Sequence, residues 1–578
     1  MDERTNPPIR HDCPESILGS QHRREAIRRL SEERLDVLVV GAGVTGIGCA
    51  LDAASRGMSV AVVEQHDLAS GTSSRSSKLI HGGLRYLEQF QFALVKEALR
   101  ERNLLLSRLA PHLVKRVDFL YPVQRLRERL YAGLGISLYD LMASRGPRLL
   151  PRHHHLRRQQ VAKDAPALKD RSHKGAIVYS DALVDDARFV ISAARTAAKL
   201  GASIATSTRV VDLSRSKDRV SGATVRCLES GREIGVSCGT VVNATGVWSD
   251  DIEAYAGESN SRVRASKGIH LVVPRDRINL ETGLILRTTD SVLFVIPSDN
   301  HWIVGTTDSD WSLDRAHPAA THRDITYLIT TLNEVLTDPL TTDDVVGVYV
   351  GLRPLLAGDS DKTSKLSREH AVTSSTGGLV SIAGGKYTTY RVMAADTIDM
   401  VGIDQGLDLP KSSTDQVPLL GSEGYVQLRA QISEIAETWG VLPATVDHLL
   451  SRQGDRIYEV LDLIKEDVSL AELIDPRLPY VRAEVVHAVR FEAALHLEDV
   501  LTRRTRLSIE SPDRGTDSAL EVAELMAREL NWDQRRLDSE VAHYLDRVAA
   551  ERASNEQLDD VTADARRVAV GEVRDNLN

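Results

Sequence analysis

The hydrophobic pattern is clearest near the N-terminus, where two short apolar runs flank a helical stretch. Residues 36–40 form a run rich in β-branched side chains, which predicts a buried parallel strand. Residues 47–56 have helical character, and residues 59–63 are a second run of the β-branched kind. The pattern therefore predicts a strand–helix–strand unit within about 30 residues, the size of a βαβ unit.

The turn between the first strand and the helix carries three glycines in the spacing G-x-G-x-x-G. Gly41 permits the tight turn, Gly43 lets a pyrophosphate touch the backbone, and Gly46 lets helix and strand pack closely. The helix N-terminus offers free N–H groups to the phosphates. Glu64 ends the second strand, where a carboxylate accepts from ribose hydroxyls and repels a 2′-phosphate. We therefore predict an FAD or NAD site, and a tight turn without a ligand is the alternative.

Further along the chain, the periodicity alternates between helices and strands and then becomes purely helical. Helices are expected over residues 92–109, 185–200 and 387–401, and from residue 413 onward. Strands are expected over residues 202–236, 240–246, 269–273, 292–296, 302–305 and 379–386. Residues 202–236 indicate a small antiparallel sheet inserted into the dinucleotide fold. Residues 351–354 interrupt the strand pattern.

Length and charge divide the chain into several units. At 578 residues it is too long for one hydrophobic core. Residues 413–578 carry 19 Lys and Arg against 33 Asp and Glu, whereas the remainder is slightly positive. This asymmetry indicates a separate acidic C-terminal unit. No clustered basic footprint is evident, so no nucleic-acid partner is predicted.

The cysteines and histidines do not indicate a metal site. Cys13, Cys49, Cys227 and Cys238 are scattered without a C-x-x-C pair, which argues against a disulfide framework or zinc and fits a reducing cytoplasm. The three histidines at 153–155 lie in an arginine-rich stretch that we expect to be a surface loop. We therefore predict no metal.

Membrane contact is an open question for one segment. Residues 1–34 are polar and contain no signal peptide, and no run of eighteen apolar residues occurs in the chain. Residues 125–158 are basic and interleaved with apolar groups, a pattern that suits an anionic bilayer surface. A solvated surface with some core-facing residues is the alternative.

The segment over residues 67–87 mixes small hydroxylated residues, glycines and single charges. A solvated linker or a packed structural loop are two interpretations. The third is a loop laid against a ligand, because His81 and Arg85 alternate there with apolar anchors and the paired glycines Gly82 and Gly83.

Taken together, these motifs closely resemble FAD-dependent glycerol-3-phosphate dehydrogenases. The most specific is Ser-Ser-Lys-Leu-Ile-His-Gly-Gly-Leu-Arg-Tyr-Leu over residues 76–87. The others, in the same order, cover residues 41–46, 243–246, 267–270, 305–308, 351–354 and 384–391. The resemblance spans roughly residues 35–395, and Ala42 stands where the family commonly has glycine.

The resemblance implies an α/β fold of three parts. An FAD-binding Rossmann-like domain of the glutathione-reductase-like (DAO) type and a mixed-sheet substrate domain would interleave over residues 35–410, with the substrate sheet mainly at about 110–175 and 262–350. Residues 1–34 would be an N-terminal extension, and residues 411–578 an all-α C-terminal cap.

The implied reaction is oxidation of sn-glycerol 3-phosphate to dihydroxyacetone phosphate, with hydride transfer from C2 to N5 of FAD. Arginine forks and a lysine point charge suit the phosphate. The implied substrate contacts are Arg85, Tyr86, Arg353, Arg368 and Lys386, of which Arg353 and Lys386 are also expected to act in catalysis.

Two histidines are candidates for the base that takes the C2 hydroxyl proton. Imidazole titrates near neutral pH and suits this role. His81 and His270 both lie in the matched motifs, and the sequence does not choose between them.

The expected cofactor contacts come from every matched motif. They are Gly41, Gly43, Val44, Thr45, Gly46, Glu64, Gln65, Thr72, Ser73, Ser77, Lys78, His81, Gly82, Gly83, Leu84, Val210, Ala244, Thr245, Gly246, Trp248, Arg353, Gly385, Lys386, Tyr387 and Thr388.

The resemblance further implies a membrane quinone as electron acceptor and a peripheral position on the cytoplasmic face of the cell membrane, against its anionic surface. A homodimer is left open. An oxidase of the same substrate that uses oxygen and an amine or amino-acid oxidase of this fold are alternatives. So are an NAD-linked dehydrogenase and a flavin-bearing interaction protein without catalysis.

Overall fold

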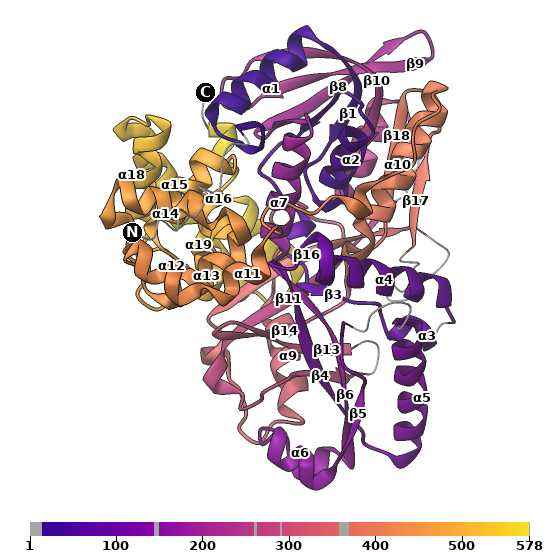
Figure 1. The fold of residues 1–578 in the computed structure, drawn as a ribbon, viewed down its shortest axis with the longest axis vertical. Helices are drawn as coiled ribbons and strands as arrows, with labels where there is room; N and C mark the ends of the chain where they lie inside the picture. Colours follow the sequence, from indigo (N-terminus) through magenta and orange to yellow (C-terminus); the bar gives the residue numbers. More distant parts are fainter. Residues whose placement is uncertain are drawn as a thin grey trace, which may run out of the picture.

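Two sheets and a bundle of C-terminal helices make up the molecule, as Figure 1 shows. This computed structural model describes residues 14–88, 90–143, 149–258, 263–288, 292–357 and 369–576. The first sheet lies at one end of the long axis, the second sheet at the other, and the C-terminal helices lie along one side of both.

The first sheet contains eight strands around the predicted strand–helix–strand unit. Its main path runs β17-β18-β10-β1-β2-β7, and β9 joins β10 to β8. The bounds are β1 (Arg34–Val40), β2 (Val60–Val63), β7 (Ser203–Ala205), β8 (Thr208–Ser216), β9 (Arg219–Cys227), β10 (Glu233–Asn243), β17 (His370–Thr373) and β18 (Leu379–Gly384). The strands β18, β10, β1, β2 and β7 are parallel, and β8, β9 and β17 pair antiparallel. The predicted antiparallel insertion is confirmed as β8, β9 and the first half of β10.

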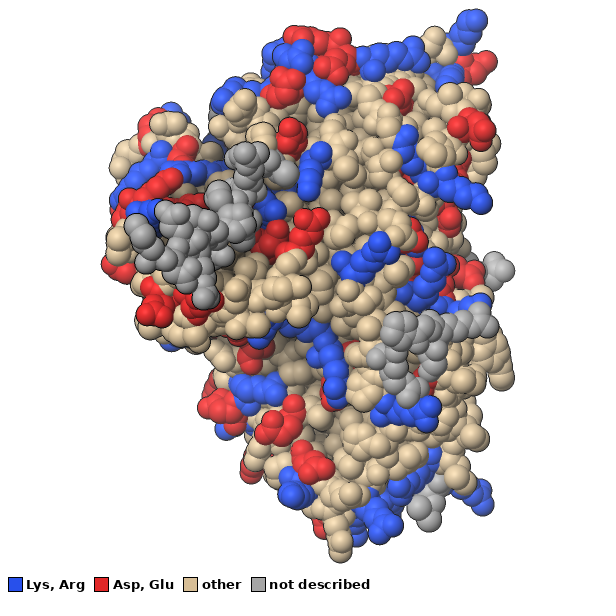
Figure 2. All heavy atoms as spheres, in the orientation of Figure 1, with Lys and Arg blue, Asp and Glu red and all other residues tan. Residues whose placement is uncertain are grey.

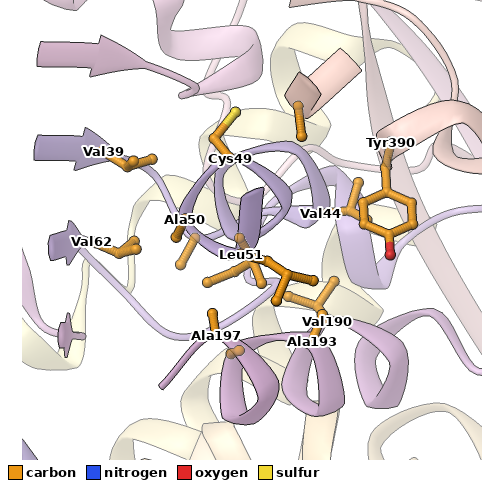
Figure 3. Close-up of a cluster of buried hydrophobic side chains, with 14 of the residues drawn as sticks. Val39, Val44, Cys49, Ala50, Leu51, Val62, Val190, Ala193, Ala197 and Tyr390 are labelled. Atoms are coloured by element: carbon orange, nitrogen blue, oxygen red, sulfur yellow. The ribbon is translucent and has the colours of Figure 1, made fainter. Parts of the chain in front are cut away.

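Three helices cover one face of this sheet: α2 (Val44–Ser55), α7 (Asp186–Lys199) and α10 (Tyr390–Gln405). Figure 3 shows α2 between the strands and α7, with Ala50 and Leu51 facing Val39, Val62 and Ala197. The helices approach closely because small residues line the contact: a Cβ on Gly48 would lie 2.9 Å from the Tyr390 ring. This packing holds the N-terminus of α2 at the end of β1.

A helix from the N-terminal extension packs on the opposite face of the sheet. Helix α1 (Ser20–Glu32) buries Ala26 and Leu30 against β7 and β10 in a common apolar cluster. Leu18 forms a bridge with Glu492 of the C-terminal helices. The described part of the extension is therefore integrated into the fold. Helix α8 (Ser249–Tyr255) packs against the same apolar cluster.

The second sheet has ten strands, nearly all antiparallel, with the order β15-β11-β14-β13-β12-β4-β6-β3 and with β16 on β11 and β5 on β6. The bounds are β3 (Leu79–Ile80), β4 (Val114–Pro122), β5 (His154–Arg157), β6 (Gly175–Val184), β11 (Val263–Pro274), β12 (Gly283–Arg287), β13 (Val292–Ser298), β14 (His301–Gly305), β15 (Ser309–Trp311) and β16 (Gly347–Leu356). Helix α9 (His322–Asn333) covers one face.

Two local expectations are wrong in this sheet. Residues 351–354 do not interrupt a strand, because β16 runs through them in unbroken register with β11. The histidine stretch is not a loop: β5 pairs with β6, since hydrogen bonds from the edge of a sheet outweigh a weak local preference.

Four further helices follow along the chain: α3 (Arg85–Glu88), α4 (Phe92–Leu104) with a π-turn at Leu105–Leu109, α5 (Leu126–Ala143) and α6 (Arg158–Asp164). The first three contact one another, and α6 packs on β5 and β6 at the far end of the second sheet. Within the described ranges, no helix is long and apolar enough to cross a bilayer.

The C-terminal unit is helical, as predicted, and has its own apolar core. Its helices are α11 (Tyr425–Ala430), α12 (Ile432–Trp439), α13 (Pro443–Gln453), α14 (Ile457–Glu466), α15 (Arg482–Phe491), α16 (Leu497–Asp499), α17 (Leu507–Glu510), α18 (Ala519–Leu530), α19 (Gln534–Asn555) and α20 (Asp560–Val568). Local signals delimit them: Pro443 begins α13, Asn531 ends α18 in the left-handed region, and Asp533 caps α19 by accepting from the Arg536 N–H.

Candidate active site

A cavity of about 600 Å³ opens where the parallel strands of the first sheet end. The carboxyl ends of β1, β2, β10 and β18 border it, and β11 and β16 of the second sheet form the facing wall. Such a crevice is where α/β sheets bind ligands. The two sheets therefore build one site from segments that are far apart in sequence.

The glycine turn forms one end of this cavity. Gly41 has a φ of +100°, and a Cβ there would lie 2.8 Å from the Ala244 carbonyl oxygen. A Cβ on Gly46 would lie 1.9 Å from the Gly41 oxygen, so only glycine allows α2 to approach β1 this closely. The Ser73 hydroxyl accepts a 2.9 Å hydrogen bond from the Val44 N–H and holds the next loop over the helix N-terminus. The backbone is thus shaped for close approach of phosphates.

Glu64 lies beside this turn at the end of β2. Its carboxylate accepts hydrogen bonds of 2.8 Å from the N–H groups of Ala42 and His66. Burial raises the pKa of Glu64, and the two backbone bonds oppose that shift. Val210 lines the same end of the cavity. A carboxylate fixed here is placed to receive a hydroxylated ligand.

His270 lies on β11 at the other end of the cavity. Its Nε2 is 2.8 Å from the Ser77 hydroxyl, and its ring stacks on Tyr349 with centroids 4.7 Å apart. Burial, together with the nearby charges of Arg353 and Lys78, holds the pKa of His270 well below its usual value. Burial and these charges therefore favour the neutral imidazole, the form that a general base must start from.

Two cations, Arg353 and Lys386, line the same cavity as this histidine. Arg353 on β16 donates to the Thr306 hydroxyl at 3.0 Å and to the Thr307 carbonyl oxygen at 3.3 Å, and Asp308 is 3.7 Å away. The Lys386 ammonium stands 3.6 Å from the centroid of the Tyr86 ring. Arg353, Lys386 and Tyr86 all line the cavity, which gives it a positive wall for an anion.

His81 reaches the cavity from the loop after β3. Its N–H donates to the Thr388 hydroxyl at 3.1 Å, so the segment before α10 holds this loop. The neighbouring Gly82 N–H donates to the Tyr139 hydroxyl at 2.8 Å, and that hydroxyl donates to Asp181. The loop is therefore anchored from both sides, and α5 supplies one of the anchors.

Comparisons with known proteins give the same picture over nearly the whole chain. The FAD dependent oxidoreductase family model matches residues 36–391, and the model for the C-terminal domain of alpha-glycerophosphate oxidase matches residues 412–537. Glycerol-3-phosphate dehydrogenase 2 of Mycobacterium tuberculosis is 53% identical over 563 residues, which cover 97% of this chain and 96% of that protein. The mitochondrial glycerol-3-phosphate dehydrogenase of Bos taurus is 35% identical over 529 residues, 88% of this chain and 72% of that protein.

The chain belongs to the family of FAD-dependent glycerol-3-phosphate dehydrogenases. The solved structure of the glycerol-3-phosphate dehydrogenase from Bacillus halodurans, complexed with FAD, matches with a TM-score of 0.77 at 27% identity, covering 92% of this chain and 97% of that one. The predicted family, fold and FAD cofactor are thereby confirmed.

The cavity of this family member fits FAD at both ends. The cofactor's pyrophosphate needs a backbone without side chains, and the glycine turn provides it. Its ribose needs a carboxylate, and Glu64 is fixed beside the turn. At the far end, Gly385 has a φ of +82° and, with Tyr387 and Thr388, forms the wall after β18.

Most of the predicted contacts meet in this one cavity. The lining residues among them are Gly41, Gly43, Val44, Thr45, Glu64, Gln65, Thr72, Ser73, Ser77, His81, Tyr86, Val210, Ala244, Thr245, Gly246, Trp248, His270, Arg353, Gly385, Lys386, Tyr387 and Thr388. The site roles of these residues remain predictions, because their placement establishes only that they are together.

A few predicted residues lie elsewhere. Gly46, Gly82, Gly83 and Leu84 shape the surrounding backbone without lining the cavity. Lys78 is turned away: its ammonium is buried and pairs with Asp186 at 2.5 Å. The prediction that Lys78 contacts the cofactor therefore has no support from its position. The Arg85 side chain and Arg368 lie outside what the structure describes.

Three arginines that we did not predict also line the cavity: Arg75, Arg209 and Arg315. Arg75 directly precedes the most specific motif, and Arg209 directly precedes Val210, so proximity to a motif was a usable signal for both. Arg315 donates to the Val247 carbonyl oxygen and pairs with Asp251, and no local pattern marks it. Among the described residues, no group of His, Cys, Asp and Glu side chains is arranged to hold a metal ion.

Proposed function

We propose that the protein oxidises sn-glycerol 3-phosphate to dihydroxyacetone phosphate and passes the electrons to a membrane quinone. The observation that carries this proposal is that a buried histidine and two cations, Arg353 and Lys386, line one cavity. Oxidation of a phosphorylated alcohol needs these groups: an acceptor for the hydroxyl proton and a clamp for the phosphate. FAD, when bound, supplies the acceptor for the two electrons.

The proton goes to His270 in this proposal. Its low pKa keeps the imidazole in the basic form, and the Ser77 hydroxyl at 2.8 Å fixes the ring. Stacking on Tyr349 prevents the ring from turning. His81 lines the same cavity, and its backbone N–H donates to the Thr388 hydroxyl. We favour His270 because both a hydrogen bond and ring stacking fix its imidazole.

The phosphate goes to Arg353 and Lys386. Arg353 lines the cavity, donates to threonine oxygens and lies 3.7 Å from Asp308, and its planar fork suits a phosphate. Lys386 is oriented by the Tyr86 ring. Arg85 and Arg368 complete the predicted clamp.

The surface of helix α5 supports the membrane part of this proposal. One row of this helix exposes large apolar side chains: Leu130, Tyr131, Leu134, Leu138 and Leu141. Leu134 is 73% exposed, while Tyr139 on the inner face is 1% exposed and holds the loop next to His81. Figure 2 shows acidic and basic side chains interspersed over the visible face of the molecule. The feature of α5 that supports the proposal is its exposed apolar row.

We assign this row to an anionic lipid surface on the cytoplasmic face of the membrane. Exposed arginines at the start of α5, Arg125 and Arg127, suit anionic headgroups, and the apolar row suits the interface below them. Leu134→Glu should lower co-flotation with phosphatidylglycerol-containing vesicles ~10-fold or more, because burying one leucine contributes about 1.5–3 kcal/mol. Leu442→Glu, at a leucine that is 72% exposed on the C-terminal unit, is the matched control. Equal flotation of Leu134→Glu and wild type would refute the assignment.

One experiment tests the reaction itself. Purified protein with FAD is mixed anaerobically with sn-glycerol 3-phosphate, and the 450 nm band is followed; it is then mixed with a quinone analogue or with air. We expect bleaching by the substrate and rapid recovery with the quinone. No bleaching would reject the substrate, and rapid recovery in air alone would favour the oxidase.

A further inference from the structure

A second, smaller cavity lies where the C-terminal helices meet the two sheets. Its volume is about 100 Å³. It is lined by Arg75 from the domain built around the first sheet (the first domain), by β16, and by residues of α19 and α20. A water molecule occupies about 30 Å³ in the liquid, so the cavity has room for roughly three waters or one ion of five heavy atoms. Arg75 also lines the large cavity, so the two cavities share a wall.

Two of the arginines facing this small cavity have no carboxylate partner among the described residues. The Arg75 side chain donates to the Ala316 carbonyl oxygen at 2.8 Å, and Arg547 on α19 donates only to the Arg567 carbonyl oxygen, at a long 3.4 Å. Arg547 is 7% exposed. Burial, with Arg567 nearby, lowers the pKa of Arg547 to about 9, although the charges of Glu572 and Glu551 oppose that shift.

The carboxylates at this cavity are engaged with other groups. Glu551 is shared between Arg567 at 3.2 Å and Arg514 at 3.6 Å, and Glu498 lies 3.9 Å from Arg503. Three arginines therefore face the cavity against two carboxylates, and both carboxylates already have cationic neighbours. The lining retains an excess of positive charge that a small anion would balance.

Hydrogen-bonding groups around the cavity are also incomplete. The hydroxyls of Ser74 and Ser508 and the Nε of Arg567 are buried and have no partner within the described ranges. Unpaired buried polar atoms are costly and call for a ligand or water. Hydroxyls and guanidinium N–H groups are all donors, which is the complement of an ion with several acceptor oxygens.

We propose that this small cavity binds a tetrahedral oxyanion, of which inorganic phosphate is the simplest. The ion would join Arg75 of the first domain to Arg547 on α19, and so would tie the C-terminal helices to the wall of the flavin cavity. This site is separate from the proposed substrate clamp, because Arg353 and Lys386 line the large cavity only.

The test must distinguish this site from phosphate in the substrate clamp. Thermal unfolding of the FAD-loaded protein is measured during titration with inorganic phosphate at constant ionic strength, in wild type and in Arg353→Gln. We expect the melting temperature to rise with the logarithm of phosphate concentration in both, since ligand binding to the native state is stabilising. Loss of the whole response in Arg353→Gln would overturn the proposal.

Variants of the small cavity complete the test. Arg547→Gln should lose most of the remaining response, whereas Arg535→Gln, at an exposed arginine of the same helix, should keep it. If Arg547→Gln does not fold, Ser508→Ala removes one donor and should weaken phosphate binding. Phenyl phosphate should not raise the melting temperature of Arg353→Gln, because its phenyl ring does not fit in the small cavity. An undiminished response in Arg547→Gln or Ser508→Ala, or an equal response to phenyl phosphate, would overturn the proposal and leave the cavity to water.

Discussion

The charged residues of the large cavity and those at the junction with the C-terminal helices are arranged in opposite ways. In the cavity, Arg353 is oriented by neutral threonine oxygens and Lys386 by an aromatic ring. At the junction, Arg504 forms two bonds of 2.7 Å to the buried Asp67, and Arg195 forms bonds of 2.8 and 2.9 Å to Glu459. Arg353 is partly buried and lies 3.7 Å from Asp308, whereas the junction arginines are buried with carboxylate oxygens at 2.7–2.9 Å.

This difference separates binding from structure. A buried arginine with a bidentate carboxylate is electrically complete and cannot bind a substrate anion without losing its partner. A partly exposed arginine whose carboxylate lies farther away loses less when it binds an anion. Burial of a cation alone therefore does not identify a ligand site; the identity of its partners does.

The largest expected effect is on the base. His270→Gln should reduce kcat for sn-glycerol 3-phosphate by about 10²–10⁴-fold, the usual contribution of a general base, while the visible spectrum of bound FAD stays the same. Ser77→Ala should cause a smaller loss, since it removes only the hydrogen bond that orients Nε2. Steady-state kinetics check both. A full-strength His270→Gln enzyme together with an inactive His81→Gln enzyme would transfer the role to His81.

The next effect concerns the junction. Asp67→Asn should destabilise the protein by ~3–5 kcal/mol, because it leaves Arg503 and Arg504 buried without their shared carboxylate. Thermal unfolding and proteolysis of the C-terminal helices report this loss. Glu233→Gln breaks a pair with Arg226 that is about half exposed, and should change stability by only about 0–1 kcal/mol. Equal effects would show that the junction is not held by its buried pairs.

The third largest effect is expected from Arg353, a cation of the large cavity. Arg353→Gln should lower kcat/KM by ~10–100-fold, since a hydrogen bond to a charged group contributes about 1.5–3 kcal/mol, with little change in melting temperature. Arg353→Lys should recover only part of the loss, because lysine keeps the charge but not the fork. A large loss of stability in Arg353→Gln would place Arg353 with the structural arginines instead.

The smallest effect is a pH dependence of the junction. His496 contacts Glu229 of the first domain at 2.8 Å and Glu540 of α19 at 2.9 Å. The paired His496 and the neighbouring Arg536 lower the pKa of Glu229 to about 2 despite its burial. The contribution of Glu229 to stability is therefore present above its ordinary pKa of 4.5 and is lost as the pH falls toward 2. Contacts with Glu229 and Glu540 raise the pKa of His496 despite burial. The contribution of His496 to stability is therefore complete below its ordinary pKa of 6.5 and is lost as the pH rises through the raised pKa.

This cluster should therefore stabilise the junction most between about pH 4.5 and 6.5. Melting temperatures measured from pH 3 to 9 in wild type and in His496→Gln check this expectation. The difference between the two proteins should shrink at both ends of the range. A constant difference across the range would mean that His496 contributes through packing alone.

Much of the architecture was readable from local sequence. The strand at 36–40, the three glycines and the helix after them correspond to β1, the turn and α2, since steric limits on φ and the period of apolar residues act over a few positions. The helical C-terminal unit followed from the same periodicity. Strand pairing was less accessible: β16 continues through residues 351–354 because β11 supplies hydrogen bonds from far away in sequence.

The sequence alone determined the family of motifs, the cofactor turn and the set of residues from which a site would be made. Only the tertiary structure decided how each was used. It buried the His270 imidazole and lowered its pKa, turned Lys78 onto Asp186, and brought Arg75 between two cavities. The physical reason is that charge state depends on burial and on neighbours brought together by folding, and neither is contained in the residues next to a histidine or a lysine in the chain.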